Sequence, residues 1–182
     1  MTRGNARELA VHLIYGRNFT GEEPNAVVET RLEKEYYSKL SAENDVYAER
    51  PSRVQRAYID AVTSGVANRE DDLNETIQQF SIGWDVKRIS RLNRVIMQLA
   101  VYEILYVEDV PEGVAVSEAV RLAKKYNDEM GRFVNGILGA FVRAWKADPN
   151  FLENLAAEEA AKIAPAEETV EVTEEAPAAE EI

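Results

Sequence analysis

The chain has 182 residues, 33 acidic and 21 basic, with a net charge of −12 at neutral pH. This length is typical of one domain with a short appendage. Most of the negative charge lies at the C-terminal end, because residues 147–182 contain eleven acidic residues and one basic residue. Residues 1–146 carry a net charge of only −2, so the acidic composition does not exclude a local basic surface in this part.

The chain has no cysteine and a single histidine, His12. Disulfides, thiolate metal sites and cysteine nucleophiles are therefore excluded, and a zinc site built on His or Cys has too few ligands. Residues 1–7 are polar, unlike a signal peptide, and no apolar run approaches the roughly 20 residues of a membrane span. We expect a cytoplasmic protein with no metal, no cofactor and no membrane partner.

Apolar residues recur at helical spacing along most of the chain, and no alternating run is long enough for a strand. The pattern predicts an all-α fold, a helical bundle of about seven helices. In chain order, the stripes and their flanking residues place these helices over residues 3–17, 24–40, 51–66, 69–80, 89–102, 116–123 and 133–145.

Two of these helices carry finer expectations. In the third helix we expect Val54, Ala57, Tyr58, Ala61, Val62 and Val66 to face the core. In the last helix, Gly136 and Gly139 each lower helix stability by roughly 1 kcal/mol relative to alanine. Small residues let a neighbouring helix approach, so we interpret both glycines as sites of close packing.

The C-terminal segment has a different composition. Residues 165–182 are Glu, Ala, Pro, Val, Thr and Ile without an aromatic residue, and such a segment buries too little apolar area to order itself. We expect a helical domain over residues 1–147 and an acidic tail over 148–182 that is disordered beyond about residue 164.

Basic residues beside an aromatic residue suggest a surface for single-stranded nucleic acid. Arg3 and Arg7 share one face near the start of the first helix, where the helix dipole prefers anions, so local stability does not explain them. Lys124-Lys125 and Arg132-Phe133 bracket the turn before the last helix. Single-stranded RNA binds to a cation for its phosphate and an aromatic face for its base, which contributes about 1–3 kcal/mol per base. The alternatives are a solvated helix terminus and a core role for Phe133.

Catalytic motifs are missing from the sequence. It contains no Gly-rich phosphate loop, no Gly-x-Ser-x-Gly elbow and no cluster at metal-ligand spacing, and its carboxylates are scattered. We therefore expect a binding protein and not an enzyme.

Several motifs occur in the order found in one known family. Residues 3–15 form an arginine-containing helix that ends in Ile-Tyr, and residues 84–104 contain Arg-Leu-Asn-Arg and Leu-Ala-Val-Tyr-Glu. Val-Pro at 110–111, the helix at 114–124 and Phe-Val-Asn-Gly at 133–136 complete the set. Over roughly residues 3–146 the chain resembles the NusB family of transcription antitermination factors.

The resemblance implies a helical fold in two subdomains. It also implies binding of boxA RNA together with NusE, a small-subunit ribosomal protein, within complexes that make RNA polymerase resist termination. By position, the resemblance implies the following RNA contacts: Arg3, Arg7, Tyr15, Tyr58, Arg132 and Phe133. Gly4, Asn5 and Gln98 stand where the family often has basic residues, which implies weak RNA binding by the protein alone.

Other interpretations remain open at this point. The same domain occurs at the front of some rRNA cytosine methyltransferases, which would require a Rossmann-like domain and a catalytic cysteine that this sequence lacks. A helical module that binds only protein is a third interpretation, and an exposed apolar face of such a bundle is a candidate for homodimer formation. We expect the acidic tail to be solvated, the alternative being a tail that competes with RNA for the basic surface.

Overall fold

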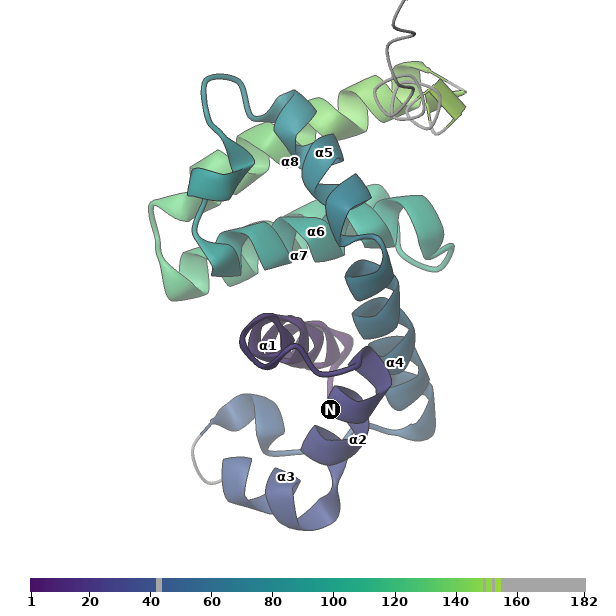
Figure 1. Cartoon of the computed structure of the whole chain (residues 1–182), viewed down its shortest axis with the longest axis vertical. Helices are drawn as coiled ribbons and strands as arrows, with labels where there is room; N and C mark the ends of the chain where they lie inside the picture. The colour runs from purple at the N-terminus through teal and green to yellow at the C-terminus, as the bar shows by residue number, and fades with distance from the viewer. Residues whose placement is uncertain (42–43, 149, 152, 155–182) are drawn as a thin grey trace, which may run out of the picture. The chain divides into compact units, whose positions relative to one another are not determined.

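The computed structural model describes residues 1–41, 44–148, 150–151 and 153–154, and the chain divides into the units Met1–Ala147 and Asp148–Ile182. Regular structure in the described residues is entirely helical, which confirms the all-α class (Figure 1). The predicted disorder beyond residue 164 lies outside the described residues. The helices of the first unit, eight α and two 3₁₀, are α1 Arg3–Thr20, α2 Pro24–Leu32, α3 Lys34–Leu40, η1 Asp45–Tyr47, α4 Arg53–Asn68, α5 Glu70–Phe80, η2 Val86–Arg88, α6 Arg91–Tyr106, α7 Glu112–Tyr126 and α8 Met130–Ala147.

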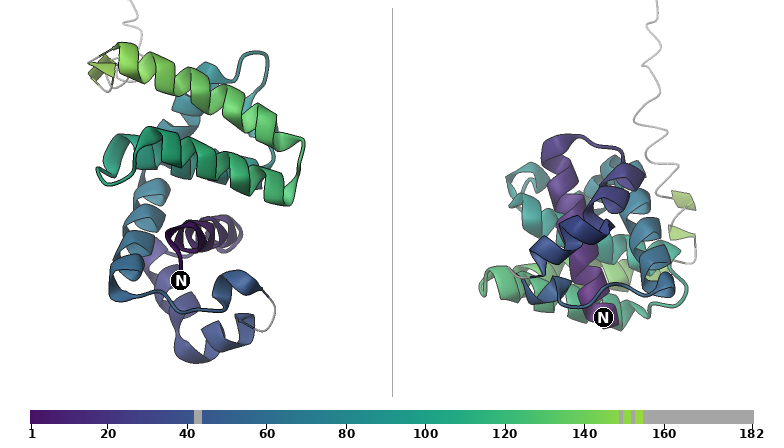
Figure 2. Two further views of the ribbon diagram at one scale, coloured as in Figure 1. Left: turned by 180° about the vertical axis from the view of Figure 1, so that it is seen from behind. Right: turned by 90° about the horizontal axis from the view of Figure 1, so that it is seen from below.

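The first unit consists of two groups of helices. In the N-terminal group α1 packs on α2, α4 and η1, and α2 packs on α3. In the C-terminal group α7 packs on α6 and α8, and α5 packs on α6 and α8 (Figure 2). The contacts of α6 with α1 and α4 join the groups. The two predicted subdomains are thus confirmed, and α1 lies where they meet.

Side-chain caps account for several helix boundaries. The Thr2 hydroxyl accepts from the Asn5 amide at the start of α1, and the Ser90 hydroxyl does the same for Asn93 at the start of α6. Ser52 and Gln55 form a reciprocal capping box at the start of α4. Such caps satisfy amides that have no partner in the first helical turn.

The expected helix over residues 24–40 is two helices, α2 and α3, because Glu33 is extended at φ −58°, ψ 141°. Leu32 and Tyr37 are both 2% exposed. In one continuous helix these side chains would point about 140° apart, given roughly 3.6 residues per turn. The break at Glu33 lets both face the core.

The expected inward face of α4 is confirmed for Tyr58, Val62 and Val66, which are buried, and wrong for the other three residues. On α4 the side chain of Val54 is 74% exposed, and Ala57 and Ala61 are exposed as well, because α4 buries the stripe that contains Ile59 and Val66.

The glycines of α8 do not mark close packing either. A Cβ atom at Gly136 would meet nothing within 4 Å, and one at Gly139 would meet only the end of the Arg143 side chain. Close approach occurs instead at Gly65, where a Cβ atom would lie 2.1 Å from the Tyr102 ring.

Candidate nucleic-acid interface

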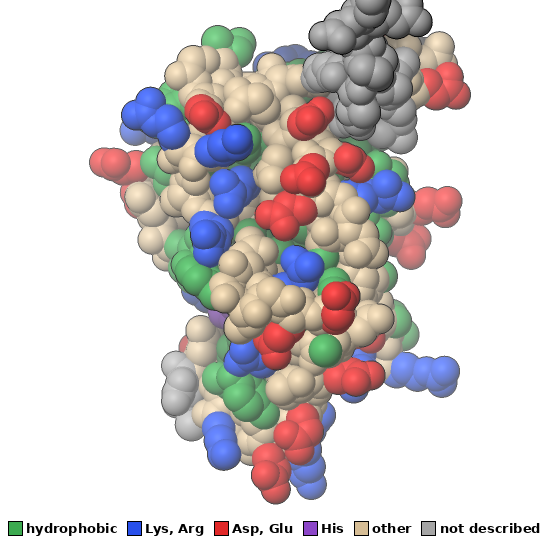
Figure 3. All heavy atoms as spheres, viewed as in Figure 1, with side chains coloured by type: hydrophobic (Ala, Val, Ile, Leu, Met, Phe, Trp, Pro, Cys, Tyr) green, Lys and Arg blue, Asp and Glu red, His purple; other side chains and the backbone are tan. Residues whose placement is uncertain are grey.

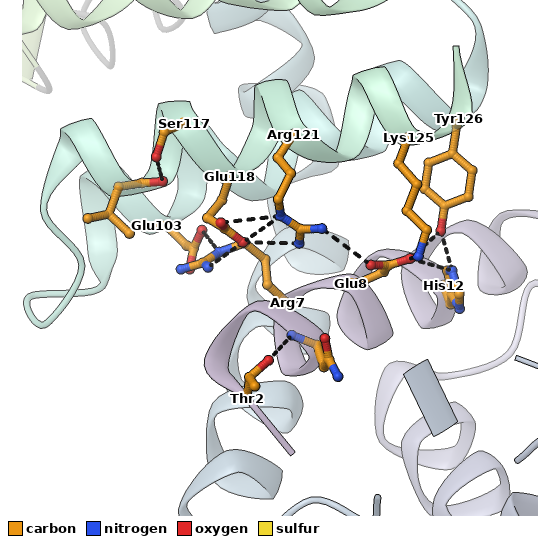
Figure 4. Close-up of polar contacts among 12 residues, drawn as sticks. Thr2, Arg7, Glu8, His12, Glu103, Ser117, Glu118, Arg121, Lys125 and Tyr126 are labelled. Atoms are coloured by element: carbon orange, nitrogen blue, oxygen red, sulfur yellow. Dashed lines mark hydrogen bonds and ion pairs between the residues drawn. The ribbon is translucent and has the colours of Figure 1, made fainter. Parts of the chain in front are cut away.

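A buried ion pair joins α1 to α6. The Arg7 side chain is 3% exposed and that of Glu103 is 0% exposed. Arg7 Nε donates to Glu103 Oε2 at 2.8 Å and Arg7 Nη2 donates to Oε1 at 2.8 Å (Figure 4). The Tyr58 hydroxyl of α4 donates to Oε1 at 2.8 Å. Burial acts to lower the pKa of Arg7, but the hydrogen bond and charge of Glu103 outweigh it and the pKa is raised.

Further ion pairs connect α1 to α7. Glu118 lies 3.4 Å from Arg7 Nη1 and 3.1 Å from Arg121 Nη2. One turn beyond Arg121, Lys125 Nζ donates to Glu8 Oε1 at 2.6 Å, although the Glu8 side chain is only 2% exposed. These pairs hold the N-terminal helix against the C-terminal group. Lys125, which the sequence suggested as a cation for RNA, is thus already paired with Glu8.

His12 extends this set of contacts. Its Nε2 lies 2.6 Å from the hydroxyl oxygen of Tyr126, which donates to Glu8, and its Nδ1 lies 3.0 Å from the Tyr47 hydroxyl. A neutral imidazole with its proton on Nε2 satisfies both contacts. Burial lowers the pKa of His12, opposed by the charge of Glu8 and assisted by that of Lys125. Burial has the opposite effect on Tyr126 and raises the pKa of its hydroxyl, and the charge of Glu8 raises it further.

Arg3 lies at the exposed start of α1. Its guanidinium carbon is 4.3 Å from the centre of the Tyr58 ring, a cation–π contact. Tyr58 is 8% exposed, and burial raises the pKa of its hydroxyl, as does the nearby charge of Glu103. Arg3 is therefore presented to solvent on a buried tyrosine, which is in turn held by the Arg7–Glu103 pair.

A second exposed cluster lies at the other end of α1. The rings of Tyr15 and Phe19 meet edge to face at 5.1 Å, and Phe19 is 64% exposed. The Arg91 guanidinium carbon, from the start of α6, lies 4.4 Å from the centre of the Phe19 ring. An aromatic face and a cation are thus exposed side by side.

A third cluster forms where α8 begins. Phe133 is partly exposed and its ring meets the ring of Trp84 edge to face at 5.8 Å. Trp84 is 55% exposed and precedes η2, and Arg132 beside Phe133 is exposed. We name Trp84, Arg132 and Phe133 the stacking platform, since it combines an aromatic surface with a cation.

The surface around the start of α6 is basic. Figure 3 shows Lys and Arg side chains gathered along the left margin of this face, over η2 and the beginning of α6. Lys87, Arg88 and Arg91 are exposed in this segment. Acidic side chains gather over α5, whose first turn is Glu70, Asp71 and Asp72. The near-neutral helical unit therefore separates its charges into distinct patches.

The six residues expected to contact RNA occupy three places: Arg3, Arg7 and Tyr58 at the start of α1, Tyr15 near its end, and Arg132 and Phe133 at the start of α8. Arg7 and Tyr58 are buried, so a direct RNA contact from either would have to open the contacts of Glu103. Both stay predictions as RNA contacts, and their positions favour a supporting role. Sequence reasoning missed Trp84, Phe19 and Arg91 as site residues, although each stands near a helix end in a basic or aromatic context.

No helix among the described residues has the length and apolarity needed to span a bilayer. In the same residues no group of three or more His, Asp or Glu side chains is placed to hold a metal ion.

Comparison with known proteins gives consistent matches. Residues 4–143 match the model of the NusB family. The transcription antitermination protein NusB of Symbiobacterium thermophilum is 35% identical over 147 residues, which cover 80% of this chain and 92% of the relative. The crystal structure of T. maritima NusB aligns with a TM-score of 0.65 at 23% identity, covering 79% of this chain and 92% of that one. A crystal structure of antitermination factors NusB and NusE in complex with dsRNA aligns with a TM-score of 0.61 at 21% sequence identity, covering 78% of this chain and 96% of that one. The chain belongs to the NusB family.

Proposed function

We propose that this protein is a transcription antitermination factor, a non-catalytic adaptor that binds boxA RNA together with NusE. Family membership supports the proposal, since the relatives are named as transcription antitermination proteins. A NusB homologue of the same fold has been crystallised with NusE and dsRNA. The names of the relatives favour this function over the methyltransferase interpretation.

The observation that carries the RNA-binding part is the stacking platform. Its two aromatic rings remain partly exposed although they contact each other, and Arg132 beside them makes no ion pair within the described residues. Stacking on such a surface tolerates any base, whereas the neighbouring guanidinium reaches the phosphate. A core role alone for Phe133 would not explain the exposure of Trp84.

Arg3 supplies a second phosphate contact in this proposal. It is exposed, its guanidinium lies over the Tyr58 ring, and it forms no ion pair within the described residues, so its donors can reach a phosphate. Arg7 and Tyr58 act beneath it as positioning residues, because they fix the start of α1 through Glu103.

This proposal assigns only a few of the exposed cations to RNA, Arg3 and Arg132 among them. On single strands each neutralised phosphate contributes about −0.7 to the slope of log affinity against log salt, so three or four contacts give a shallow dependence. The protein alone therefore binds weakly, and NusE provides the remaining affinity. Assembly with RNA polymerase and a cytoplasmic location are parts of the proposal that follow from the family assignment. Homodimer formation through an exposed apolar face of the bundle is a further part.

Fluorescence anisotropy of a labelled boxA RNA, titrated with the full chain with and without NusE, tests the proposal. We expect weak binding alone and a clear gain in affinity with NusE. No gain would refute the adaptor role. If NusE bound the protein while RNA did not, the interpretation as a protein-only module would replace it.

A further inference from the structure

A small pocket lies between the end of α1 and the beginnings of α5 and α6. It has a volume of about 230 Å³ and is lined by Arg17, Asn18, Gly21, Glu70, Arg91 and Arg94. We name it the arginine pocket. Three arginines face one carboxylate there, in a chain whose net charge is −12.

The arginines of this pocket are not neutralised by ion pairs. None of the three forms an ion pair within the described part of the chain. The Nε atoms of Arg17 and Arg94 are buried without a hydrogen-bond partner, counted over the same residues. A buried donor left unsatisfied is costly, and more so when it is charged. Two such donors belong to arginines of one pocket, so the chain itself leaves both guanidinium groups short of acceptors.

The helix that carries two of these arginines adds to the positive potential. Arg91 and Arg94 stand in the first turn of α6, where the helix dipole already favours an anion over a cation. An oxyanion in the pocket would neutralise the arginines and at the same time accept hydrogen bonds from their guanidinium groups. The planar fork of each guanidinium suits the oxygens of a phosphate.

The surroundings of the pocket distinguish a nucleic acid from a lone anion. Phe19 is 64% exposed. Arg91, which lines the pocket, also lies over the Phe19 ring, with its guanidinium carbon 4.4 Å from the ring centre. Tyr15 meets the same ring. An exposed aromatic group beside a phosphate site provides a stacking surface for the attached base. A carboxylate from a partner protein would use the arginines and leave Phe19 unexplained.

We propose that the arginine pocket binds a backbone phosphate of single-stranded RNA, with the adjoining base against Phe19. The proposal rests on the proposed function and adds a contact at the end of α1, opposite to the end that carries Arg3. Of the six RNA contacts that the family resemblance implied, this proposal uses only Tyr15, whose ring contacts that of Phe19.

Two measurements on the full chain test the pocket. In the first, NMR follows the arginine Nε–Hε signals during titration with inorganic phosphate; we expect the signals of Arg17 and Arg94 to shift and that of Arg143 to stay. Arg143 is an exposed arginine of α8 and serves as the control. This measurement needs no substitution, so it does not depend on how a variant folds.

The second measurement is the salt dependence of boxA RNA binding in the presence of NusE. We expect Arg17→Gln to lower the affinity about 10-fold at low salt, as for loss of a charge-assisted hydrogen bond. We also expect it to make the log–log slope shallower by about 0.7. Arg143→Gln removes the same charge elsewhere and should change neither quantity. Arg94→Gln provides a second variant of the pocket, and the unfolding midpoint of each variant verifies its fold.

The possible failures are distinguishable. If Arg17→Gln and Arg94→Gln behave like Arg143→Gln, the pocket does not contact RNA and the proposal is overturned, whereas the proposed function stands. Phosphate shifts with an unchanged RNA slope would assign the pocket to free phosphate only. Loss of NusE affinity without a change in RNA slope would assign it to a carboxylate of the partner. If the unsubstituted protein binds no RNA even with NusE, the proposed function itself fails, while the phosphate titration still reports on the pocket.

Discussion

Replacing Glu103 by Gln removes the carboxylate that neutralises Arg7 inside the helical unit. Glu103 is 0% exposed and accepts from Arg7 and from the Tyr58 hydroxyl, so its loss leaves a buried guanidinium without its main partner. Breaking one side of a buried pair costs about 3–5 kcal/mol. Glu118 remains 3.4 Å from Arg7 and offsets part of this loss, which places the expected value toward the lower end. For a unit of this size about 1 kcal/mol shifts the melting temperature by roughly 2–4 °C, so the melting temperature falls by at least about 6 °C.

Urea unfolding followed by circular dichroism measures this loss, with equal m-values as the sign that both proteins unfold in the same manner. Glu112→Gln is the matched control, because Glu112 pairs with Lys146 at the surface, where such pairs contribute about 1 kcal/mol or less. Arg7→Gln together with Glu103→Gln should cost less than the sum of the single changes, since the two residues interact directly. A loss for Glu103→Gln no larger than that of the control would refute the structural role of the pair.

Three further outcomes are expected. RNA should quench the fluorescence of Trp84, and Trp84→Phe should abolish this quenching; a signal that persists in the variant would contradict the stacking platform. Because the pKa of His12 is lowered in the folded state, the unfolded chain takes up the proton first as pH falls. Unfolding free energy should therefore fall as the pH drops below about 6.5, by at most about 1.4 kcal/mol per pH unit, and His12→Gln should flatten this dependence. Gly65→Ala should destabilise the fold by about 1–3 kcal/mol through overlap with Tyr102, whereas Gly136→Ala should stabilise it by about 1 kcal/mol. Urea midpoints that move in the opposite directions would contradict the close packing at Gly65 and the open space at Gly136.

The helices were largely predictable from the sequence, because an amphipathic helix repeats its apolar residues at a period that a single chain reveals. The break at Glu33 was not predictable, since apolar residues continue across it. Only the burial of both Leu32 and Tyr37 requires the chain to change direction there. The inward face of α4 was predicted correctly at Tyr58, Val62 and Val66 but wrongly at Val54, Ala57 and Ala61, because alanine and valine are compatible with either face of a helix.

The candidate site was predictable only in part. Arg132 and Phe133 stand next to each other in the sequence, so their combination was visible there. Arg7 looks like a solvent-exposed cation in the sequence, yet its partner Glu103 lies 96 residues away and only the tertiary fold buries both. Trp84 likewise gains its meaning from contact with a ring 49 positions further along the chain.

The affinity of boxA RNA for the full chain with NusE, compared with that of Phe133→Ala, tests the central claim most directly. Phe133 is only partly buried, so the variant should fold, and a circular dichroism melt verifies this. Loss of one stacked base predicts an affinity lower by about 5- to 150-fold, which corresponds to about 1–3 kcal/mol. An unchanged affinity in a folded variant would contradict the claim that this platform binds RNA.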